Sequence, residues 1–220
     1  MKQNDLQLYC FKYAQSFLPE SWIFSGGKQD INVPIAFSVY LICTQNKKIL
    51  VDAGCVTMPG FEMKDFKSPV TVLKENGIEA KDITDVIITH AHHDHIEAVK
   101  FFDGATIHIS SEEYENAKAY IPENFRVSTF EEEFCFSPQI RALKWGGHSK
   151  GSSIVEIKAA DKIHILAGDE CYTNANIEQR ICTGKFYNKE KAIEFAQKYS
   201  DAKYRVHTCH DITIKTERII

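Results

Sequence analysis

The sequence predicts an α/β protein in which two mixed β-sheets are covered by helices. Two strand-like segments, residues 33–42 and 47–54, are separated by a short polar turn, and a second such pair covers residues 154–157 and 163–166. Helix-forming segments lie between other strand-like segments along the chain. Paired strands with helices returning between them are typical of layered α/β folds.

The first pair of segments is the most regular. Residues 33–42 (VPIAFSVYLI) and 47–54 (KKILVDAG) are rich in β-branched and aromatic residues. Such residues suit the pleated, half-buried surface of a β-hairpin. Because the polar residues 44–47 join the two segments, we expect two antiparallel strands here.

A helix is expected after this hairpin. Ser68 can cap its N-terminus, Pro69 suits its first turn, and Gly77 can adopt the left-handed conformation that ends a helix. Residues 83–88 (ITDVII) are then predicted to form a buried strand, which is followed directly by THAHHDH at residues 89–95. The histidine-rich segment is therefore expected at the carboxyl end of a strand.

The same alternation continues to the end of the chain. Residues 105–109 are predicted to form a strand, and the helix after it carries Glu112 and Glu113 in its first turn, where acidic residues favour the helix dipole. Asn188 is expected to cap a last helix, and residues 204–207 to form the final strand. The buried side of the last helix is expected to carry Ala192, Ile193, Phe195, Ala196 and Tyr199.

Length and composition limit the possible functions. The chain has 220 residues, 44% of them hydrophobic, so residues 1–220 are expected to form one domain with one sizeable core. Its net charge of −4 argues against a nucleic-acid partner, which usually requires a basic face. The amino-terminal segment has no apolar run long enough for a signal peptide or a membrane span, so no membrane partner is expected. The seven cysteines are scattered and odd in number, which favours reduced thiols and a cytoplasmic location.

The segment THAHHDH is the strongest functional signal. In extended backbone, side chains two residues apart point the same way, so His90 and His92 can reach one cation together. Asp94 falls on the same side, and His95 turns to the other side where the loop bends. One segment could thus supply ligands to two adjacent ions. Imidazole and carboxylate suit zinc, iron or manganese, and no cysteine pair is present for a closed structural zinc site.

A catalytic site for two metal ions needs further ligands from elsewhere in the chain. Three candidates lie in loops that follow or precede strand-like segments: His148, Asp169 and His210. Glycines beside the first two would let the backbone approach the ions closely. His207 is an alternative to His210, although it falls within the predicted strand and could pack there. Three other histidines are expected on the surface or hydrogen-bonded in the core: His93, His108 and His164.

The ordered set of candidate ligands resembles the pattern of the metallo-β-lactamase superfamily. Residues 51–54 (VDAG) are similar to an early motif of that superfamily, whose aspartate supports the metal loop without binding metal. The resemblance covers residues 33–212 and implies an αββα sandwich holding two divalent metal ions at one edge, zinc being expected and iron or manganese the alternatives. It further implies that the first ion is bound by His90, His92 and His148, the second by Asp94, His95 and His210, and both by Asp169.

Within this superfamily, the chain is most similar to the N-acyl homoserine lactonases. Residues 169–172 (DECY) match their Asp-x-x-Tyr motif, in which the tyrosine hydroxyl reaches toward the substrate carbonyl. The resemblance implies a hydrolase that uses the hydroxide of a binuclear site to open a carbonyl ester, in particular a lactone. Asp94 would relay the proton and Tyr172 would stabilise the oxyanion. An acyl-chain pocket is expected from residues 9–24 and 125–136.

Three positions depart from the family pattern. Residues 96–98 (IEA) replace the small residues that commonly follow the metal motif, Lys150 stands where a proline is frequent, and residues 152–153 (SS) stand where a further histidine is often found. Three alternatives therefore stay open: a glyoxalase II-like thioesterase, an iron-dependent persulfide dioxygenase, and a metal-binding relative without catalysis. The thioesterases usually carry an added carboxy-terminal region, and the dioxygenase would use one iron and leave His95 and His210 free.

Overall fold

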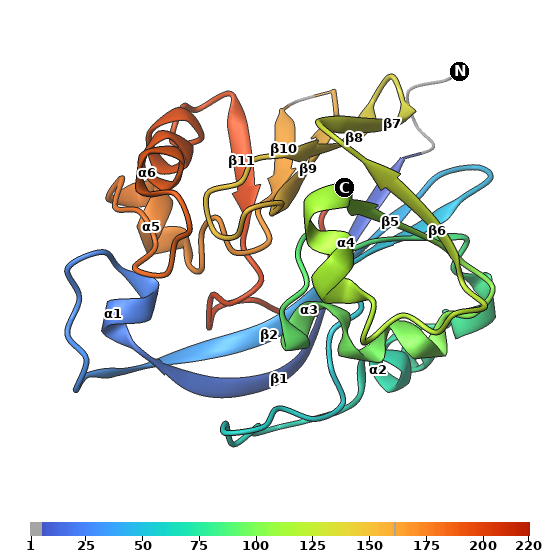
Figure 1. The fold of residues 1–220 in the computed structure, drawn as a ribbon, viewed down its shortest axis with the longest axis horizontal. Coiled ribbons are helices and arrows are strands. Elements are labelled where there is room, and N and C mark those ends of the chain that lie inside the picture. The colour runs from blue at the N-terminus through green and yellow to red at the C-terminus, as the bar shows by residue number, and fades with distance from the viewer. Residues whose placement is uncertain (1–5, 161) are drawn as a thin grey trace.

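Residues 6–160 and 162–220 are described by the computed structural model, in which two β-sheets stack face to face (Figure 1). Within these residues, the first sheet contains β1 (Gln7–Pro19), β2 (Asn32–Cys43), β3 (Lys48–Val51), β4 (Asp85–Ile87), β5 (Thr106–Ser110), β6 (Arg126–Phe130) and β12 (Glu217–Arg218). The second contains β7 (Glu133–Ser137), β8 (Ile140–Lys144), β9 (Ser153–Lys158), β10 (Ile163–Leu166) and β11 (Tyr204–His207).

Both sheets are mixed, as predicted. The strand order is β12-β1-β2-β3-β4-β5-β6 in the first sheet and β11-β10-β9-β8-β7 in the second. Strands β3 to β6 pair in parallel, as do β10 and β11. The other neighbouring strands are antiparallel.

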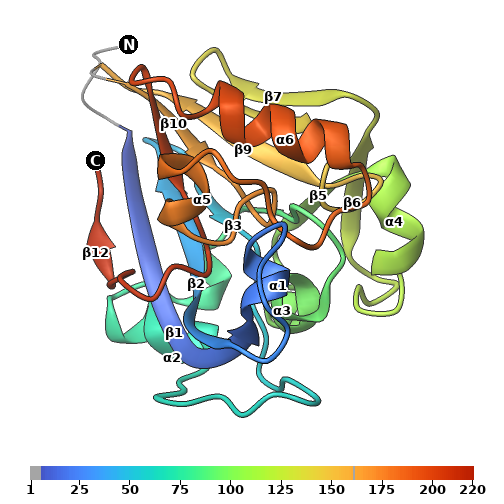
Figure 2. The same cartoon turned by 90° about the vertical axis from the view of Figure 1, so that its left-hand side faces the viewer.

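Short helices cover the outer faces, which completes the αββα sandwich. They are α1 (Glu20–Ile23), α2 (Pro69–Glu75), α3 (His93–Ile96), α4 (Ser111–Ala117), α5 (Asn174–Glu178) and α6 (Lys189–Lys198), with 3-10 turns η1 (Ala80–Asp82) and η2 (Glu97–Phe101). Figures 1 and 2 show α6 lying along the second sheet, while α2 and α4 lie on the side of the first. Among the described residues, no helix combines the length and the apolar character needed to cross a bilayer.

Apolar cores fill the space between the sheets and the space beneath the outer helices. In β2, Val39 and Leu41 pack in the outer core of the first sheet, while Tyr40 and Ile42 lie in the core between the sheets. This alternation follows from the two-residue period of a strand. Phe195 of α6 closes the outer core of the second sheet.

The predicted hairpin and helix caps are confirmed. Strands β2 and β3 pair in antiparallel register, as do β9 and β10. At the start of α2, Ser68 Oγ accepts a hydrogen bond from the backbone N–H of Thr71, and Gly77 follows the helix with a φ of 79°. At the start of α6, the side chain of Asn188 accepts from the backbone N–H of Lys191. These local signals are sufficient to begin and end both helices.

Some elements differ from the sequence-based expectation. Strand β1 is not evident from the sequence, because a bulge between Lys12 and Ala14 interrupts its two-residue alternation. Strands β6, β7 and β8 are likewise not expected from the pattern. Strand β11 is not the last, since β12 follows and pairs with β1. Ile193 is 38% exposed rather than buried, because it lies on the flank of α6, off its packed face.

The loops that follow five strands meet at one edge of the sandwich. Strands β3 and β4 are parallel neighbours in the first sheet, and β8, β10 and β11 share one direction in the second. Strands that share a direction have their carboxyl ends at the same edge of a sheet. The segments after these strands are residues 52–54, 88–95, 145–152, 167–172 and 208–211. All of the predicted ligands lie in the last four of these segments.

Candidate metal centre

The structure brings the seven predicted ligands together in two sets that share Asp169. In the first set, the Nε2 atoms of His90 and His148 each lie 3.0 Å from Nδ1 of His92. Oδ2 of Asp169 lies 3.6 Å from Nε2 of His90 and 3.5 Å from Nε2 of His148. The four ligand atoms fall within 4.8 Å of one another, a separation that one cation can span.

The second set faces the other oxygen of Asp169. Oδ1 lies 3.2 Å from Nε2 of His95 and 3.2 Å from Nε2 of His210. Oδ2 of Asp94 lies 3.5 Å and 3.4 Å from the same two nitrogens. Sγ of Cys209 lies 3.3 Å from Oδ1 of Asp169. Each oxygen of the Asp169 carboxylate thus faces one set, as expected of a ligand that bridges two cations.

The backbone of THAHHDH differs from the extended segment expected from its sequence. It is extended as far as His92, whose φ and ψ are −72° and 149°. Helix α3 then begins at His93, so Asp94 and His95 lie on a helical turn. That turn, rather than strand parity, carries both of them to the second set, where each faces His210.

Asp52 holds this segment in place, as the VDAG motif implies. Oδ1 of Asp52 accepts from the backbone N–H of Thr89 at 2.7 Å, and Oδ2 accepts from the Thr89 hydroxyl at 2.9 Å. Oδ2 also lies 2.8 Å from Nδ1 of His95, which leaves Nε2 of His95 facing the ligand set. The Nδ1 atoms of His148 and His210 likewise lie 3.0 Å and 2.9 Å from backbone carbonyl oxygens. Such outer partners orient metal-binding imidazoles.

Burial and neighbouring charges set the protonation of the site. Burial, together with nearby imidazoles, lowers the pKa of His90 and of His148. Both imidazoles are therefore uncharged, and each can offer a nitrogen lone pair to a cation. Burial also disfavours charge on His95 and His210, but the facing carboxylates outweigh it and raise the pKa of each imidazole. Burial alone would raise the pKa of Asp169, yet His95 and His210 hold it well below its usual range. The shared carboxylate is therefore ionised.

The residues present fit divalent cations. Nε2 of His95 is buried and makes no hydrogen bond of good geometry to the described residues, although carboxylate oxygens of Asp169 and Asp94 lie 3.2 Å and 3.5 Å from it. A buried polar atom of this kind calls for a partner, and a cation would provide it. Imidazole nitrogens and carboxylate oxygens, without a cysteine pair, are also ligand atoms that zinc, iron and manganese accept.

Glu113 ties together the two loops that carry the histidines of the first set. This residue of α4 is 3% exposed. Its carboxylate accepts from the backbone N–H groups of Ala91 and Gly151, each at 3.0 Å, and from the Ser149 hydroxyl at 2.6 Å. The sequence indicates Glu113 only as a first-turn helix acid, because its partners are distant along the chain.

We expect Glu113→Gln to lower the free energy of unfolding by about 1–3 kcal/mol, because the amide nitrogen would face donors that need an acceptor. Denaturant unfolding of the metal-loaded protein measures the change. Glu115→Gln is the control, since Glu115 is exposed on the same helix. Equal stability of the two variants would contradict this role of Glu113.

A second buried glutamate, Glu170, supports the loop that carries His148. Its Oε1 accepts from the backbone N–H groups of Gly147 at 3.1 Å and His148 at 3.2 Å, and from the Ser152 hydroxyl at 2.5 Å. Burial raises the pKa of this carboxyl to about 7. A Cβ at Gly147 would lie 2.2 Å from Glu170 Oε2, so the close approach requires glycine. Ser152, one of the two serines that depart from the resembled pattern, is thus a partner of Glu170.

A pocket of about 410 Å³ opens beside the ligand sets. Besides residues of both sets, its lining includes Leu18, Trp22, Phe37, Met58, Phe61, His93, Tyr172 and Lys185. Two of these come from the expected range 9–24. None of the lining residues comes from the range 125–136, contrary to expectation. Three of the four aromatic residues of that range, Phe130, Phe134 and Phe136, instead pack in the core between the sheets, and Phe125 packs against the outer core of the first sheet.

Tyr172 occupies the boundary between the apolar pocket and the ligand sets. It is 5% exposed, and its ring stacks on that of His210 with centroids 5.3 Å apart. Burial, followed by the charges of Asp169 and Asp94, raises the pKa of Tyr172 well above its usual value. The hydroxyl therefore stays protonated and available as a donor.

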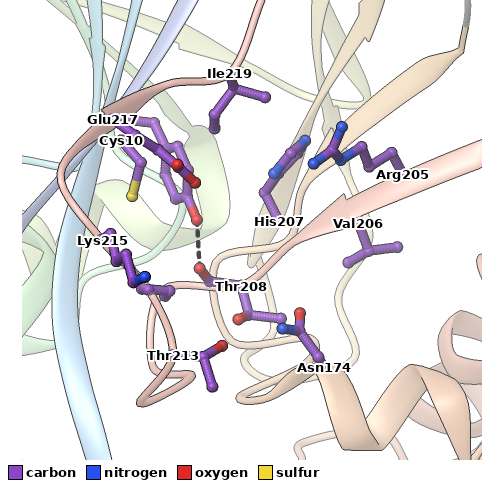
Figure 3. Close-up of a pocket in the computed structure, with 12 residues that line it drawn as sticks. Cys10, Asn174, Arg205, Val206, His207, Thr208, Thr213, Lys215, Glu217 and Ile219 are labelled. Atoms are coloured by element: carbon purple, nitrogen blue, oxygen red, sulfur yellow. Dashed lines mark hydrogen bonds between the residues drawn. The ribbon is translucent and has the colours of Figure 1, made fainter.

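His207, the alternative to His210, lies outside both ligand sets. Its ring stacks on that of His164, with centroids 5.1 Å apart, and it lines a separate pocket (Figure 3). The other histidines behave as expected: Nε2 of His93 lies 2.8 Å from the carbonyl oxygen of Thr57, and Nε2 of His108 lies 2.9 Å from Oδ1 of Asp85.

Comparison with known proteins identifies the family of this chain. A sequence model of the metallo-β-lactamase superfamily matches residues 36–169, which is more than half of the chain. The chain belongs to the metallo-β-lactamase superfamily. It is accordingly a hydrolase of the metallo-β-lactamase fold.

The relatives and the similar structures include lactonases. An N-acyl homoserine lactonase of a Bacillus species is 27% identical over 167 residues, which cover 64% of this chain and 66% of that protein. A probable metallo-hydrolase of Methanocaldococcus jannaschii is 27% identical over 172 residues, covering 78% of this chain and 75% of that protein. An N-acyl homoserine lactone hydrolase structure with the product N-hexanoyl-L-homoserine at its catalytic metal centre is 22% identical, with a TM-score of 0.83 over 97% of this chain and 98% of that chain. This last likeness shows the shared fold.

Proposed function

We propose that this protein hydrolyses carbonyl esters, and lactones in particular, at a binuclear metal centre. The observation that carries the proposal is Asp169, whose two carboxylate oxygens each face a separate set of candidate ligands. The apolar pocket beside these sets fits an uncharged acyl group. The lactonases among the relatives support a lactone as the substrate class.

The two sets divide the ligands between the ions. One ion would be held by His90, His92, His148 and Asp169, and the other by Asp94, His95, His210 and Asp169. When bound, two divalent cations acidify water and polarise a carbonyl oxygen. We propose zinc as the native metal, with iron and manganese as alternatives that the same donors accept.

The side chains of this protein supply positioning and proton transfer. The apolar wall of the pocket, including Trp22 and Phe61, would hold the acyl part of the substrate. Asp94 is less buried than Asp169 and lines the pocket, so it is placed to accept the proton of the attacking water. The protonated hydroxyl of Tyr172 would donate a hydrogen bond to the oxyanion.

We expect Tyr172→Phe to lower kcat by about 10²-fold, because the oxyanion would lose one preorganised donor. Steady-state kinetics on a lactone measures the effect. Tyr187→Phe is the matched control, since Tyr187 is 63% exposed and does not line the pocket. An unaltered rate for Tyr172→Phe would remove Tyr172 from the reaction.

The proposed function is tested with the metal-loaded protein on matched lactone, thioester and phosphodiester substrates. We expect the lactone to be cleaved fastest. Preferred turnover of the thioester would favour a glyoxalase II-like thioesterase, and oxygen consumption with one bound iron would favour a persulfide dioxygenase. Tight metal binding with no turnover would favour a non-catalytic relative. A single domain over residues 1–220 and a cytoplasmic location stay predictions.

A further inference from the structure

A second pocket, of about 210 Å³, lies away from the metal centre (Figure 3). It is bordered by β11, by the segment that leads from β11 to β12, and by residues of β1 and β2. No residue lines both this pocket and the apolar pocket beside the ligand sets. Its chemistry is therefore separate from that of the proposed hydrolysis.

The lining of this pocket carries positive charge without ion-pair partners. Arg205 and Lys215 both line it, and neither forms an ion pair within residues 6–160 and 162–220. Figure 3 shows Lys215 on one side of the pocket and Arg205 beside His207 on the other. Burial, then His164 and Arg205, lowers the pKa of His207 to about 3, so His207 is neutral. Glu217 is the one acidic residue in the described lining.

Polar groups gather between the two cations. Thr208, Thr213 and Asn174 lie together in the lower part of Figure 3. Thr208 is 2% exposed, and its hydroxyl has no hydrogen-bond partner among the described residues. An unsatisfied buried hydroxyl costs about 1–3 kcal/mol, and a hydrogen bond to a ligand oxygen would remove this cost.

The segment that presents these groups is held in one conformation. The Asp211 carboxylate accepts from the backbone N–H of Asn174 at 2.8 Å and from that of Thr213 at 2.9 Å. The Tyr40 hydroxyl donates to the carbonyl oxygen of Thr208. The polar groups are therefore positioned before any ligand arrives, which reduces the entropy lost on binding.

We propose that this pocket binds a small organic anion through one phosphate or carboxylate group. Arg205 and Lys215 would neutralise the anion, and the Thr208 hydroxyl would donate a hydrogen bond to it. Glu217 would repel a second anionic group, so polyanions are excluded. The volume is sufficient for the anionic group and a few attached carbon atoms.

The test follows backbone ¹H–¹⁵N shifts of the zinc-loaded protein during titration with inorganic phosphate and, separately, with acetate. The residue-by-residue readout separates this pocket from the metal centre, which could also take anions. We expect saturable shifts across residues 205–217, and the more effective of the two probes identifies the anionic group. Arg205→Gln and Thr208→Val should each weaken binding about tenfold, as expected for a charge-assisted hydrogen bond.

Lys203→Gln is the charge-matched control, because Lys203 is exposed and does not line the pocket. It should bind the anion as the wild type does. The proposal is overturned if neither probe shifts residues 205–217 saturably. It is also overturned if Arg205→Gln and Lys203→Gln weaken binding equally, since that would indicate general surface charge. Circular dichroism of each variant verifies that it is folded.

Discussion

Removal of metal by a chelator is expected to abolish lactone hydrolysis, with a loss of at least about 10³-fold in kcat/KM. Apart from the proposed ligands, the titratable residues that line the described pocket are His93, Tyr172 and Lys185. None of these three side chains can replace a divalent cation. Re-addition of zinc should restore activity. Elemental analysis before and after treatment measures metal content alongside the rate.

The same treatment should lower the melting temperature. A ligand present at 100 times its Kd stabilises the folded state by about 2.7 kcal/mol, and the assembled ligand sets exist only in the folded chain. Differential scanning calorimetry of metal-loaded and metal-free protein measures the shift. Full activity in a protein shown to be metal-free, or a chain that stays metal-free when zinc, iron and manganese are offered, would contradict the proposed centre.

Asp169→Asn is expected to be the most damaging single substitution. It keeps the shape of the side chain but removes the negative charge that both ligand sets share. We expect the zinc content to fall from two ions to one or fewer. The decrease in kcat/KM should exceed the roughly 10- to 100-fold that the loss of an outer partner of a metal ligand costs.

Asp85→Asn is the matched control for this variant. Asp85 is also buried, but it pairs with Lys47 and His108 away from the ligand sets. This control should lose stability and keep both its metal and its kcat/KM. If Asp169→Asn retained two ions per chain with wild-type kinetics, Asp169 would not be the shared ligand.

Local sequence signals predict the parts of the fold that depend on neighbouring residues. Ser68 and Gly77 mark the ends of α2, and Asn188 marks the start of α6, because a cap acts within one helical turn. Strand β1 is the opposite case, since its bulge disrupts the period by which strands are detected. Its pairing with β2 depends on contacts that a single segment does not display.

The candidate site shows the same division. The sequence indicates all seven ligands that we propose, because metal binding restricts residue type and spacing so strongly that order along the chain is informative. Among the supporting residues, the VDAG motif indicates Asp52, but no motif indicates Glu113 or Glu170. Glu113 and Glu170 act by accepting backbone hydrogen bonds, and any carboxylate in the sequence could do so. The pocket lining is also misjudged at residues 125–136, because hydrophobic character does not reveal which core a strand faces.

By itself, therefore, the sequence determined the αββα class, the family and the identities of the ligands that we propose. Only the tertiary structure decided that the two oxygens of Asp169 face different sets, that α3 delivers Asp94 and His95, and which aromatic residues line the pocket. The physical reason is range. Capping, strand period and metal-ligand chemistry act through residue type and short spacing, whereas a bridging geometry or a pocket wall arises from segments that meet only after the sheets have packed.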